Sequence, residues 1–276
     1  MAYKKILTIQ DISCVGQCSL TVALPILSAC GVETCVLPSA VLSTHTAGFT
    51  GFTVRDLTED MPAIKNHWLK EGIRFDAIYT GYLGSTQQIG YVADIFAETA
   101  AEGCVKVVDP AMADNGKLYP AFDQAYVEEM KGLCAKADYV VPNITEACFL
   151  AGVEYRTDYD RAYIDLLLEK LTAIGCKNII LTGVSYVPGK TGIVVLENGS
   201  YAYYEHELLP NSCHGTGDIY ASAFVGAFVR GNSAYDAAAI AANYTMECIR
   251  YTATLDNHWY GAAFEPVLGK LIDSLK

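Results

Sequence analysis

The chain passes from strand to helix at Asn211-Ser212-Cys213-His214-Gly215-Thr216-Gly217-Asp218. Small and apolar side chains open the helix, and the two glycines let the backbone turn and approach a ligand closely. The first N–H groups of a helix lack internal partners and lie at the positive end of its dipole. This stretch therefore predicts an anion site at a helix N-terminus, with the acidic Asp218 in the first turn.

Strand and helix patterns alternate along the rest of the chain. Apolar runs typical of buried parallel strands lie at Lys4–Ile9, Glu33–Leu37, Phe75–Tyr79, Val105–Val108, Tyr139–Val141 and Asn178–Leu181. An Asn-Gly turn between Ile193–Leu196 and Tyr201–Glu205 predicts a hairpin. Helical spacing of apolar residues predicts helices over 16–30, 60–71, 86–101, 123–135, 143–151, 158–174, 215–230, 233–252 and 262–275.

This alternation predicts an α/β fold with a mostly parallel central sheet and helices on both of its faces. The 276 residues are enough for one large α/β domain or for two ordinary domains. No linker, composition break or internal repeat divides the sequence. We therefore expect residues 1–276 to form a single domain.

Composition and charge exclude several classes of protein. Hydrophobic residues make up 52% of the chain, which supports a large core and excludes intrinsic disorder. The formal net charge of -12 disfavours binding to nucleic acid. No apolar run is long enough to span a membrane, and the N-terminus lacks the apolar segment of a signal peptide. The ten cysteines have no Cys-x-x-Cys spacing, so we expect buried thiols in a reducing cytoplasm.

Ligands of open parallel sheets bind beyond the carboxyl ends of the strands, so the polar segments there are candidate sites. Asp109 follows a predicted strand and suits a hydrated Mg²⁺, although Asp-Pro is also an ordinary turn. The stretch Ala113–Leu118 is a candidate lid. Asn143 and Glu146 have the spacing of a capping box. From the spacing alone, this capping role is favoured over a metal or phosphate role, although the two roles are compatible.

Two further segments after strands, Val41–Gly48 and Thr80–Ser85, contain no Lys or Arg. They predict walls for a small, neutral ligand that carries hydroxyl groups, with Tyr82 as an aromatic face. His45 is equally compatible with a structural histidine. Asp11 follows the first strand at the same edge, where it can hydrogen-bond a ligand hydroxyl or ring nitrogen.

Taken by itself, Asp218 could simply be an acidic residue that stabilises the first turn of a helix, which is a common arrangement. Beside an anion site, however, such a carboxylate is costly unless it has a task. Taking a proton from an acceptor hydroxyl next to a transferring phosphate is one such task. The surroundings contain almost no basic residues, and Lys117 is the one nearby candidate.

In chain order these segments resemble the ribokinase-like superfamily of small-molecule kinases, and within it the pyridoxal/pyridoxamine (vitamin B6) kinases. The matching stretches span about residues 6–230 and are Ile9–Gly16, Leu42–Thr46, Gly81–Ser85, Asp109-Pro110 with Asp114, Pro142-Asn143 with Glu146, Leu181-Thr182 and Gly215–Asp218. The resemblance implies a three-layer α/β/α sandwich. It also implies ATP-dependent phosphorylation of the hydroxymethyl group of pyridoxal, pyridoxamine or pyridoxine.

The resemblance also implies roles for individual residues. Asp218 would be the general base, and the amides of Gly215, Thr216 and Gly217 would form an anion hole. Mg²⁺ would be held by Asp109 and Glu146, largely through water. The residues along the nucleotide phosphates would be Asp114, Asn143, Glu146, Thr182 and Thr216. The substrate would contact Asp11, Ser13, Val41, Thr46 and Tyr82.

Members of this family are typically dimers, and some use a monovalent cation such as K⁺. We therefore expect a homodimer whose other partners are the B6 vitamer and ATP, with no nucleic acid and no membrane.

Position 11 departs from the family pattern, because the B6 kinases carry a ring-binding Ser where this chain has Asp11. Ser13 lies two residues further on, so the local register is open. An acidic residue there resembles the hydroxymethylpyrimidine (phosphate) kinases and the sugar kinases. Those pyrimidine kinases often carry Cys at the position of Asp218. A hydroxymethylpyrimidine kinase is therefore the alternative within the superfamily.

Two alternatives come from other classes. A nicotinamide-dependent oxidoreductase would need Gly-x-Gly-x-x-Gly after the first strand, where this chain reads Asp11-Ile12-Ser13-Cys14-Val15-Gly16. A kinase-like binding protein without catalysis is expected to lack the base, and Asp218 is present.

Overall fold

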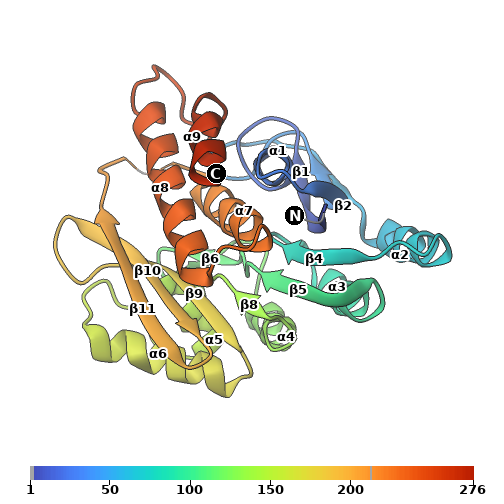
Figure 1. Cartoon of the computed structure of the whole chain (residues 1–276), viewed down its shortest axis with the longest axis horizontal. Coiled ribbons are helices and arrows are strands. Elements are labelled where there is room, and N and C mark those ends of the chain that lie inside the picture. The colour runs from blue at the N-terminus through green and yellow to red at the C-terminus, as the bar shows by residue number, and fades with distance from the viewer. Residues whose placement is uncertain (1–2, 212) are drawn as a thin grey trace.

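A computed structural model of the chain describes residues 3–211 and 213–276. Ser212, which belongs to the glycine-rich stretch, and the first two residues lie outside the described part. Strands between Lys5 and Glu207 form one nine-stranded sheet in the order β11-β10-β9-β8-β5-β4-β1-β2-β3 (Figure 1).

The centre of the sheet is parallel and its edges are antiparallel. The parallel strands are β1 (Lys5–Ser13), β2 (Glu33–Leu42), β4 (Phe75–Thr80), β5 (Ala100–Val108), β8 (Tyr139–Val140) and β9 (Asn178–Val184). The antiparallel strands at the edges are β3 (Val54–Asp56), β10 (Lys190–Glu197) and β11 (Ser200–Glu207). The predicted hairpin is confirmed, and its turn residues Asn198 and Gly199 both have positive φ.

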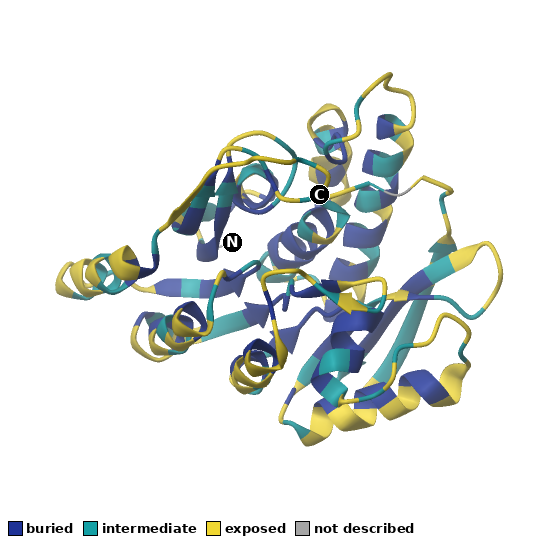
Figure 2. Ribbon diagram, turned by 180° about the vertical axis from the view of Figure 1, so that it is seen from behind, coloured by how far each residue is buried: buried dark blue, intermediate teal, exposed yellow. Residues whose placement is uncertain are grey.

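Helices cover both faces of the sheet. Against one face pack α2 (Met61–Lys70), α3 (Thr86–Glu98), α4 (Gln124–Cys134), α5 (Ile144–Ala151) and α6 (Arg161–Ala173). Against the other pack α1 (Leu20–Ala29), α7 (Thr216–Val229), α8 (Ala234–Thr252) and α9 (Leu268–Ser274). Buried residues lie where these helices meet the sheet, and exposed residues cover their outer sides (Figure 2). The α/β class, the mostly parallel sheet and the three layers are thereby confirmed.

Several predicted boundaries were wrong. Helix α1 begins at Leu20 rather than at 16, because Gly16 and Ser19 both have positive φ. Helix α3 ends at Glu98, and the two alanines that follow belong to β5. Helix α9 begins only at Leu268, after a 3₁₀ turn.

Strand β3 and the short pair β6 (Ala113–Asp114) and β7 (Lys117–Leu118) were not predicted. Across residues 3–211 and 213–276, the helices are all too short or too polar to span a bilayer.

Candidate active site

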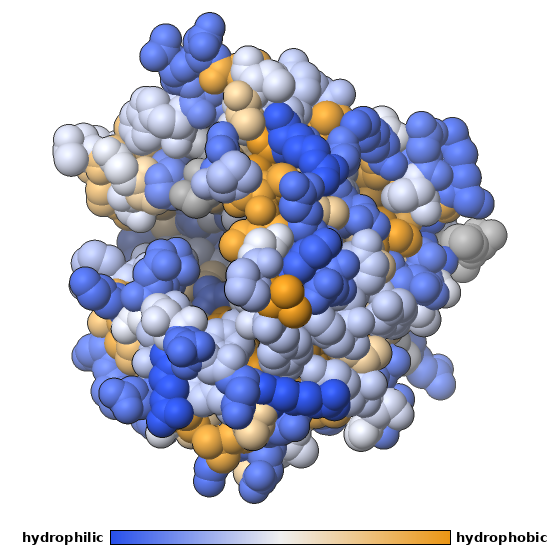
Figure 3. Space-filling model, turned by 90° about the vertical axis from the view of Figure 1, so that its left-hand side faces the viewer, coloured by the Kyte–Doolittle hydropathy of each residue, from blue (hydrophilic) through white to orange (hydrophobic). Residues whose placement is uncertain are grey.

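A cavity of about 680 Å³ lies at the carboxyl ends of the parallel strands. It runs from β1 and β2, past the N-terminus of α7, to β10 and α8. Seen from the side of β10 and β11, the surface of the molecule is visibly hollowed (Figure 3). The cavity thus occupies the edge of the sheet at which the sequence predicted the chemistry.

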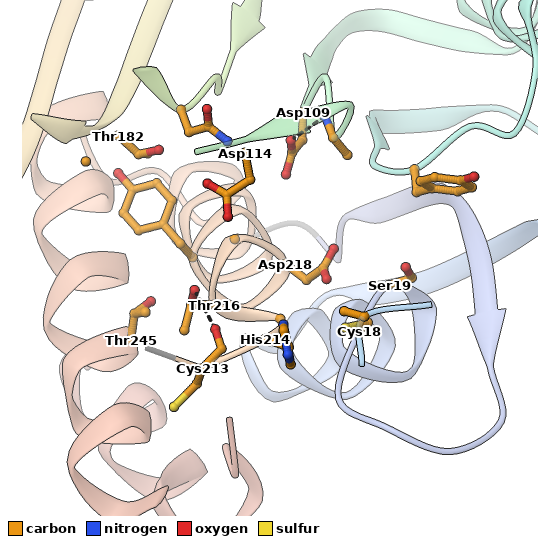
Figure 4. Close-up of a pocket in the computed structure, with 18 of the residues that line it drawn as sticks. Cys18, Ser19, Asp109, Asp114, Thr182, Cys213, His214, Thr216, Asp218 and Thr245 are labelled. Carbon is orange, nitrogen blue, oxygen red and sulfur yellow. Dashed lines mark hydrogen bonds between the residues drawn. The ribbon is translucent and has the colours of Figure 1, made fainter. Parts of the chain in front are cut away.

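The N-terminus of α7 forms the middle of this cavity. Gly215 caps the helix with a φ of 76°, and a Cβ at this position would collide with the carbonyl oxygen of Gln17. A Cβ at Gly217 would meet nothing within 4 Å, so this position leaves open space beside the first helical turn. The Thr216 hydroxyl donates to the carbonyl oxygen of Cys213 at 3.3 Å (Figure 4). A cradle bounded by helix-terminal N–H groups is suited to an anion.

Asp218 is partly buried in the first turn of α7. The pKa of its carboxyl is raised to about 7, mainly by burial; the backbone N–H of Ser19 opposes the shift and the negative charge of Asp11 adds to it. In Figure 4 the carboxylate lies between Asp109 and Ser19. A carboxyl that titrates near neutrality can accept and release a proton at physiological pH.

Two buried carboxylates flank the cavity at β5 and α5. Asp109 lies just beyond β5, and its Oδ1 accepts the backbone N–H of Ala111 at 3.1 Å. Burial raises its pKa well above the ordinary value, and the charges of Glu146 and Asp218 raise it further. Burial likewise raises the pKa of Glu146 to about 7. These carboxylates repel one another. The described residues that line the cavity include no Lys or Arg, so Lys117, the basic candidate from the sequence, does not line it.

Glu146 completes the predicted capping box of α5. Its Oε2 accepts the N–H of Asn143 at 2.9 Å, and Asn143 Oδ1 accepts the N–H of Glu146 at 2.9 Å. Its Oε1 accepts the N–H of Met112 at 3.0 Å. The cap is thereby confirmed, and the N–H of Ala113 is a further backbone donor to this carboxylate.

The candidate lid forms the two-stranded ribbon β6–β7, which is tied to α5. Asn143 Nδ2 donates to the carbonyl oxygen of Ala113 at 2.9 Å, and the N–H of Gly116 donates to Thr145 Oγ1 at 3.1 Å. Asp114 faces the cavity from this ribbon (Figure 4).

The opposite end of the cavity carries the predicted substrate residues. Asp11 is buried and accepts the Ser13 hydroxyl at 3.1 Å, and burial is the main cause of its raised pKa. Thr46 and Tyr82 also line this end. Val41 does not, because successive strand residues face opposite sides of a sheet and Leu42 takes the place in the wall.

His45 has both ring nitrogens engaged. Nε2 donates to the carbonyl oxygen of Tyr260 at 2.8 Å, and Nδ1 accepts the N–H of Ala47 at 3.2 Å. This hydrogen bonding agrees with the structural interpretation, although the ring also lines the cavity.

The structure brings together every predicted site residue except Val41. It also adds lining residues that no sequence motif indicated, namely Cys18, Ser19, Tyr119, Thr191, Ile193, His206, Tyr220, Ala242, Thr245, Met246 and Ile249. Most of these residues lie inside helices or strands. There the hydrophobic pattern of the sequence indicates which side chains are buried, but not which buried side chains line the same cavity.

Comparison with known proteins finds similarity over almost the whole chain. Residues 24–263 match the family described as phosphomethylpyrimidine kinase. A Bacteroides thetaiotaomicron structure assigned to phosphomethylpyrimidine kinase, crystallised with pyridoxal, is 38% identical with a TM-score of 0.91 and covers 98% of this chain and 96% of that one. The pyridoxal kinase of Lactobacillus plantarum is 31% identical with a TM-score of 0.90, covering 98% and 97%. A pyridoxal kinase from Dictyostelium discoideum is 27% identical over 243 residues, which are 82% of this chain and 78% of that protein.

Proposed function

The chain belongs to the phosphomethylpyrimidine kinase family of the ribokinase-like superfamily, and on that premise we propose that it transfers the γ-phosphoryl group of ATP to the hydroxymethyl group of a vitamin B6 vitamer. The acceptors are pyridoxal, pyridoxamine or pyridoxine. One observation carries the proposal: a carboxyl with a pKa of about 7, that of Asp218, lies in the first turn of α7 beside the helix-terminal N–H groups.

Asp218 is the general base in this mechanism. It takes the proton of the vitamer hydroxymethyl group as the oxygen attacks the γ-phosphorus. The N–H groups of Gly215, Thr216 and Gly217 donate to the phosphoryl oxygens as their charge changes in the transition state. The open space at Gly217 supports this role, because a side chain there would occupy the place of the phosphate.

The vitamer ring is placed at the end of the cavity that contains Asp11, Ser13, Thr46 and Tyr82. Tyr82 supplies an aromatic face for the ring. The Asp11–Ser13 pair supplies the polar contacts to its substituents or ring nitrogen. Asp114, Asn143 and Thr182 line the cavity and are assigned to the nucleotide phosphates. Thr182 lies on the side of the α7 N-terminus opposite Ser19 (Figure 4).

The acidic groups of the site fit a divalent cation. Asp109 and Glu146 are buried without a basic partner among the described lining residues, so a bound cation would offset their repulsion. Within the described chain, no three potential metal ligands converge, which suits an ion held mainly by water and phosphate. We propose Mg²⁺ held by Asp109 and Glu146, largely through water. When bound, it would supply positive charge to the nucleotide phosphates.

A hydroxymethylpyrimidine is the second candidate substrate. The observation that favours it is Asp11, because a carboxylate can accept hydrogen bonds from the amino group of an aminopyrimidine. The same base and anion cradle would serve this reaction, since both acceptors carry a hydroxymethyl group.

The test is ADP release by the purified protein with Mg-ATP and each of pyridoxal, pyridoxamine, pyridoxine, hydroxymethylpyrimidine and ribose. We expect turnover with at least one B6 vitamer and none with ribose. Turnover confined to hydroxymethylpyrimidine would select the second candidate, and no turnover with any of them would contradict the kinase proposal.

We further propose a cytoplasmic homodimer of single-domain subunits, with activity that a monovalent cation such as K⁺ increases. The continuous sheet supports the single domain, and the free cysteines support a reducing compartment. Sedimentation of the purified protein tests the dimer, and assays in K⁺, Na⁺ and a bulky organic cation test the ion requirement.

A further inference from the structure

The end of the cavity formed by β10, β11 and α8 has no role in the chemistry described above. The residues that line it include Thr191, Ile193, His206, Thr245 and Met246. In Figure 4, Thr245 and Thr182 lie on one side of the α7 N-terminus, and Ser19 lies on the other. If the γ-phosphate is at α7 and the vitamer is on the side of Ser19, the nucleoside must extend toward Thr245.

The polar side chains at this end all present lone pairs. The Thr245 hydroxyl donates to the carbonyl oxygen of Ala241 at 2.8 Å, and the Thr191 hydroxyl donates to that of Val184 at 3.5 Å. Each hydroxyl hydrogen is thus directed to the backbone, so each oxygen keeps the capacity to accept a hydrogen bond.

His206 is an acceptor for a related reason. Its Nδ1 lies 3.0 Å from the carbonyl oxygen of Glu207, which can only accept, so Nδ1 carries the hydrogen. In the neutral ring Nε2 then has a lone pair. Among residues 3–211 and 213–276, no group hydrogen-bonds to His206 Nε2.

The surroundings of His206 keep its ring neutral. Burial lowers the pKa of the imidazole. The hydrogen bond to the carbonyl oxygen of Glu207 opposes this shift, and the positive charges of Arg250 on α8 and Lys190 on β10 add to it. The carboxylate of Glu207 on the same strand is paired with Arg250 at 3.1 Å. At pH 7.5 the ring is therefore an acceptor at Nε2, and it becomes a donor only in acid.

We propose that His206 is a specificity-determining residue that selects a 6-amino purine nucleotide by accepting a hydrogen bond from the exocyclic N–H at Nε2. This inference rests on the proposed kinase function. The largely buried side chains of Ile193 and Met246 line the part of the cavity that would hold the purine ring. A 6-oxo purine in the same position would place its carbonyl oxygen opposite the lone pair of His206 Nε2. Both atoms are acceptors, so neither would be paired, and such a mismatch weakens binding.

The test compares ATP with inosine triphosphate, both by calorimetric binding and by vitamer phosphorylation. At pH 7.5 we expect ATP to bind about tenfold more tightly, the value of one well-placed hydrogen bond. The ratio should fall, and reverse in favour of inosine triphosphate, as the pH drops below the ordinary value of 6.5 for histidine, because protonated Nε2 donates to the inosine oxygen and no longer accepts from the adenine N–H. The titration of Asp218 affects both nucleotides equally and cancels in the ratio.

The substitution His206→Leu should remove the preference, and His67→Leu, on the exposed side of α2, is the matched control that should keep it. Equal wild-type affinity for the two nucleotides at every pH would overturn the inference and leave the kinase function intact. Preferential binding of ATP without phosphorylation of any vitamer would instead overturn the proposed function. Binding of neither nucleotide would overturn both. The wild-type ratio needs no variant, so a His206→Leu protein that fails to fold does not remove the test.

Discussion

Gly215 lies directly against the carbonyl oxygen of Gln17, so closely that no side chain fits between the N-terminus of α7 and the loop after β1. This contact joins two segments that are far apart in the sequence. It brings the anion cradle of α7 beside the strand that ends in Asp11 and Ser13.

The substitution Gly215→Ala should lower both stability and activity. The added Cβ collides with the carbonyl oxygen of Gln17, and the alanine must adopt the left-handed φ of 76°. We therefore expect the free energy of unfolding to fall by about 1–3 kcal/mol. Denaturant unfolding measures this loss. Gly217→Ala is the matched comparison, because its Cβ meets open space: stability should be kept while nucleotide affinity falls. Equal stability losses in the two variants would contradict this account.

The substitution Asp218→Asn tests the general base. An amide cannot accept the hydroxyl proton, so kcat should fall by about 10²–10⁴ while ATP affinity changes little. Steady-state kinetics and nucleotide titration give the two quantities. Asp165→Asn on the outer side of α6 is a suitable control. Near-normal turnover of the Asp218 variant would remove it from the role of base.

Activity and stability should respond to pH in opposite directions. The carboxyls of Asp218 and Glu146 have pKa values of about 7, raised by burial from ordinary values of 3.8 and 4.5. Turnover should therefore fall as the pH drops through 7, where the base becomes protonated. Because the pKa values are higher in the folded than in the unfolded state, protonation of these carboxyls stabilises the fold. This stabilisation of the folded state is complete below about pH 4 and is lost as the pH rises through 7.

Thermal unfolding of the ligand-free protein, compared between pH 5.5 and 8, measures the contribution of these two carboxyls to stability. In the variant Asp218→Asn with Glu146→Gln, the midpoint should depend less on pH than in the wild type. An unchanged dependence would show that these two groups are not responsible.

The substitution Asp11→Ser should change the order of kcat/KM among pyridoxal, pyridoxamine and hydroxymethylpyrimidine. It removes a buried carboxyl that hydrogen-bonds Ser13 at the vitamer end of the cavity. Competition assays with substrate pairs report the order directly. If the order stays the same, Asp11 has a structural role only.

Removal of divalent metal should weaken nucleotide binding severely. The described lining residues include no Lys or Arg, so without the cation no positively charged side chain would face the phosphates, only helix-terminal N–H groups and neutral or acidic side chains. Calorimetry with ATP in a chelator and then in excess Mg²⁺ measures the effect. Asp109→Asn should weaken the response to Mg²⁺, and unimpaired ATP binding in chelator would contradict the metal proposal.

Much of the site was predictable because its residues occupy special local positions. Asp109 follows a strand, Asn143 and Glu146 form a cap, and Gly215 begins a helix, so each is marked by its own neighbours in the sequence. Val41 was misplaced by one residue, since a strand pattern reveals which residues alternate but not which face meets the ligand.

The parallel α/β fold, the order of its elements and the helix terminus that forms the anion site could all be predicted from the amino-acid sequence, because hydrophobic period, turn residues and caps are local properties of the chain. Which distant side chains share one cavity follows from the packing of the folded chain. His206 and Thr245 meet there because β11 and α8 pack together. The near-neutral pKa of Asp218 likewise arises from protein that surrounds it in space, and burial is a property of the folded chain alone.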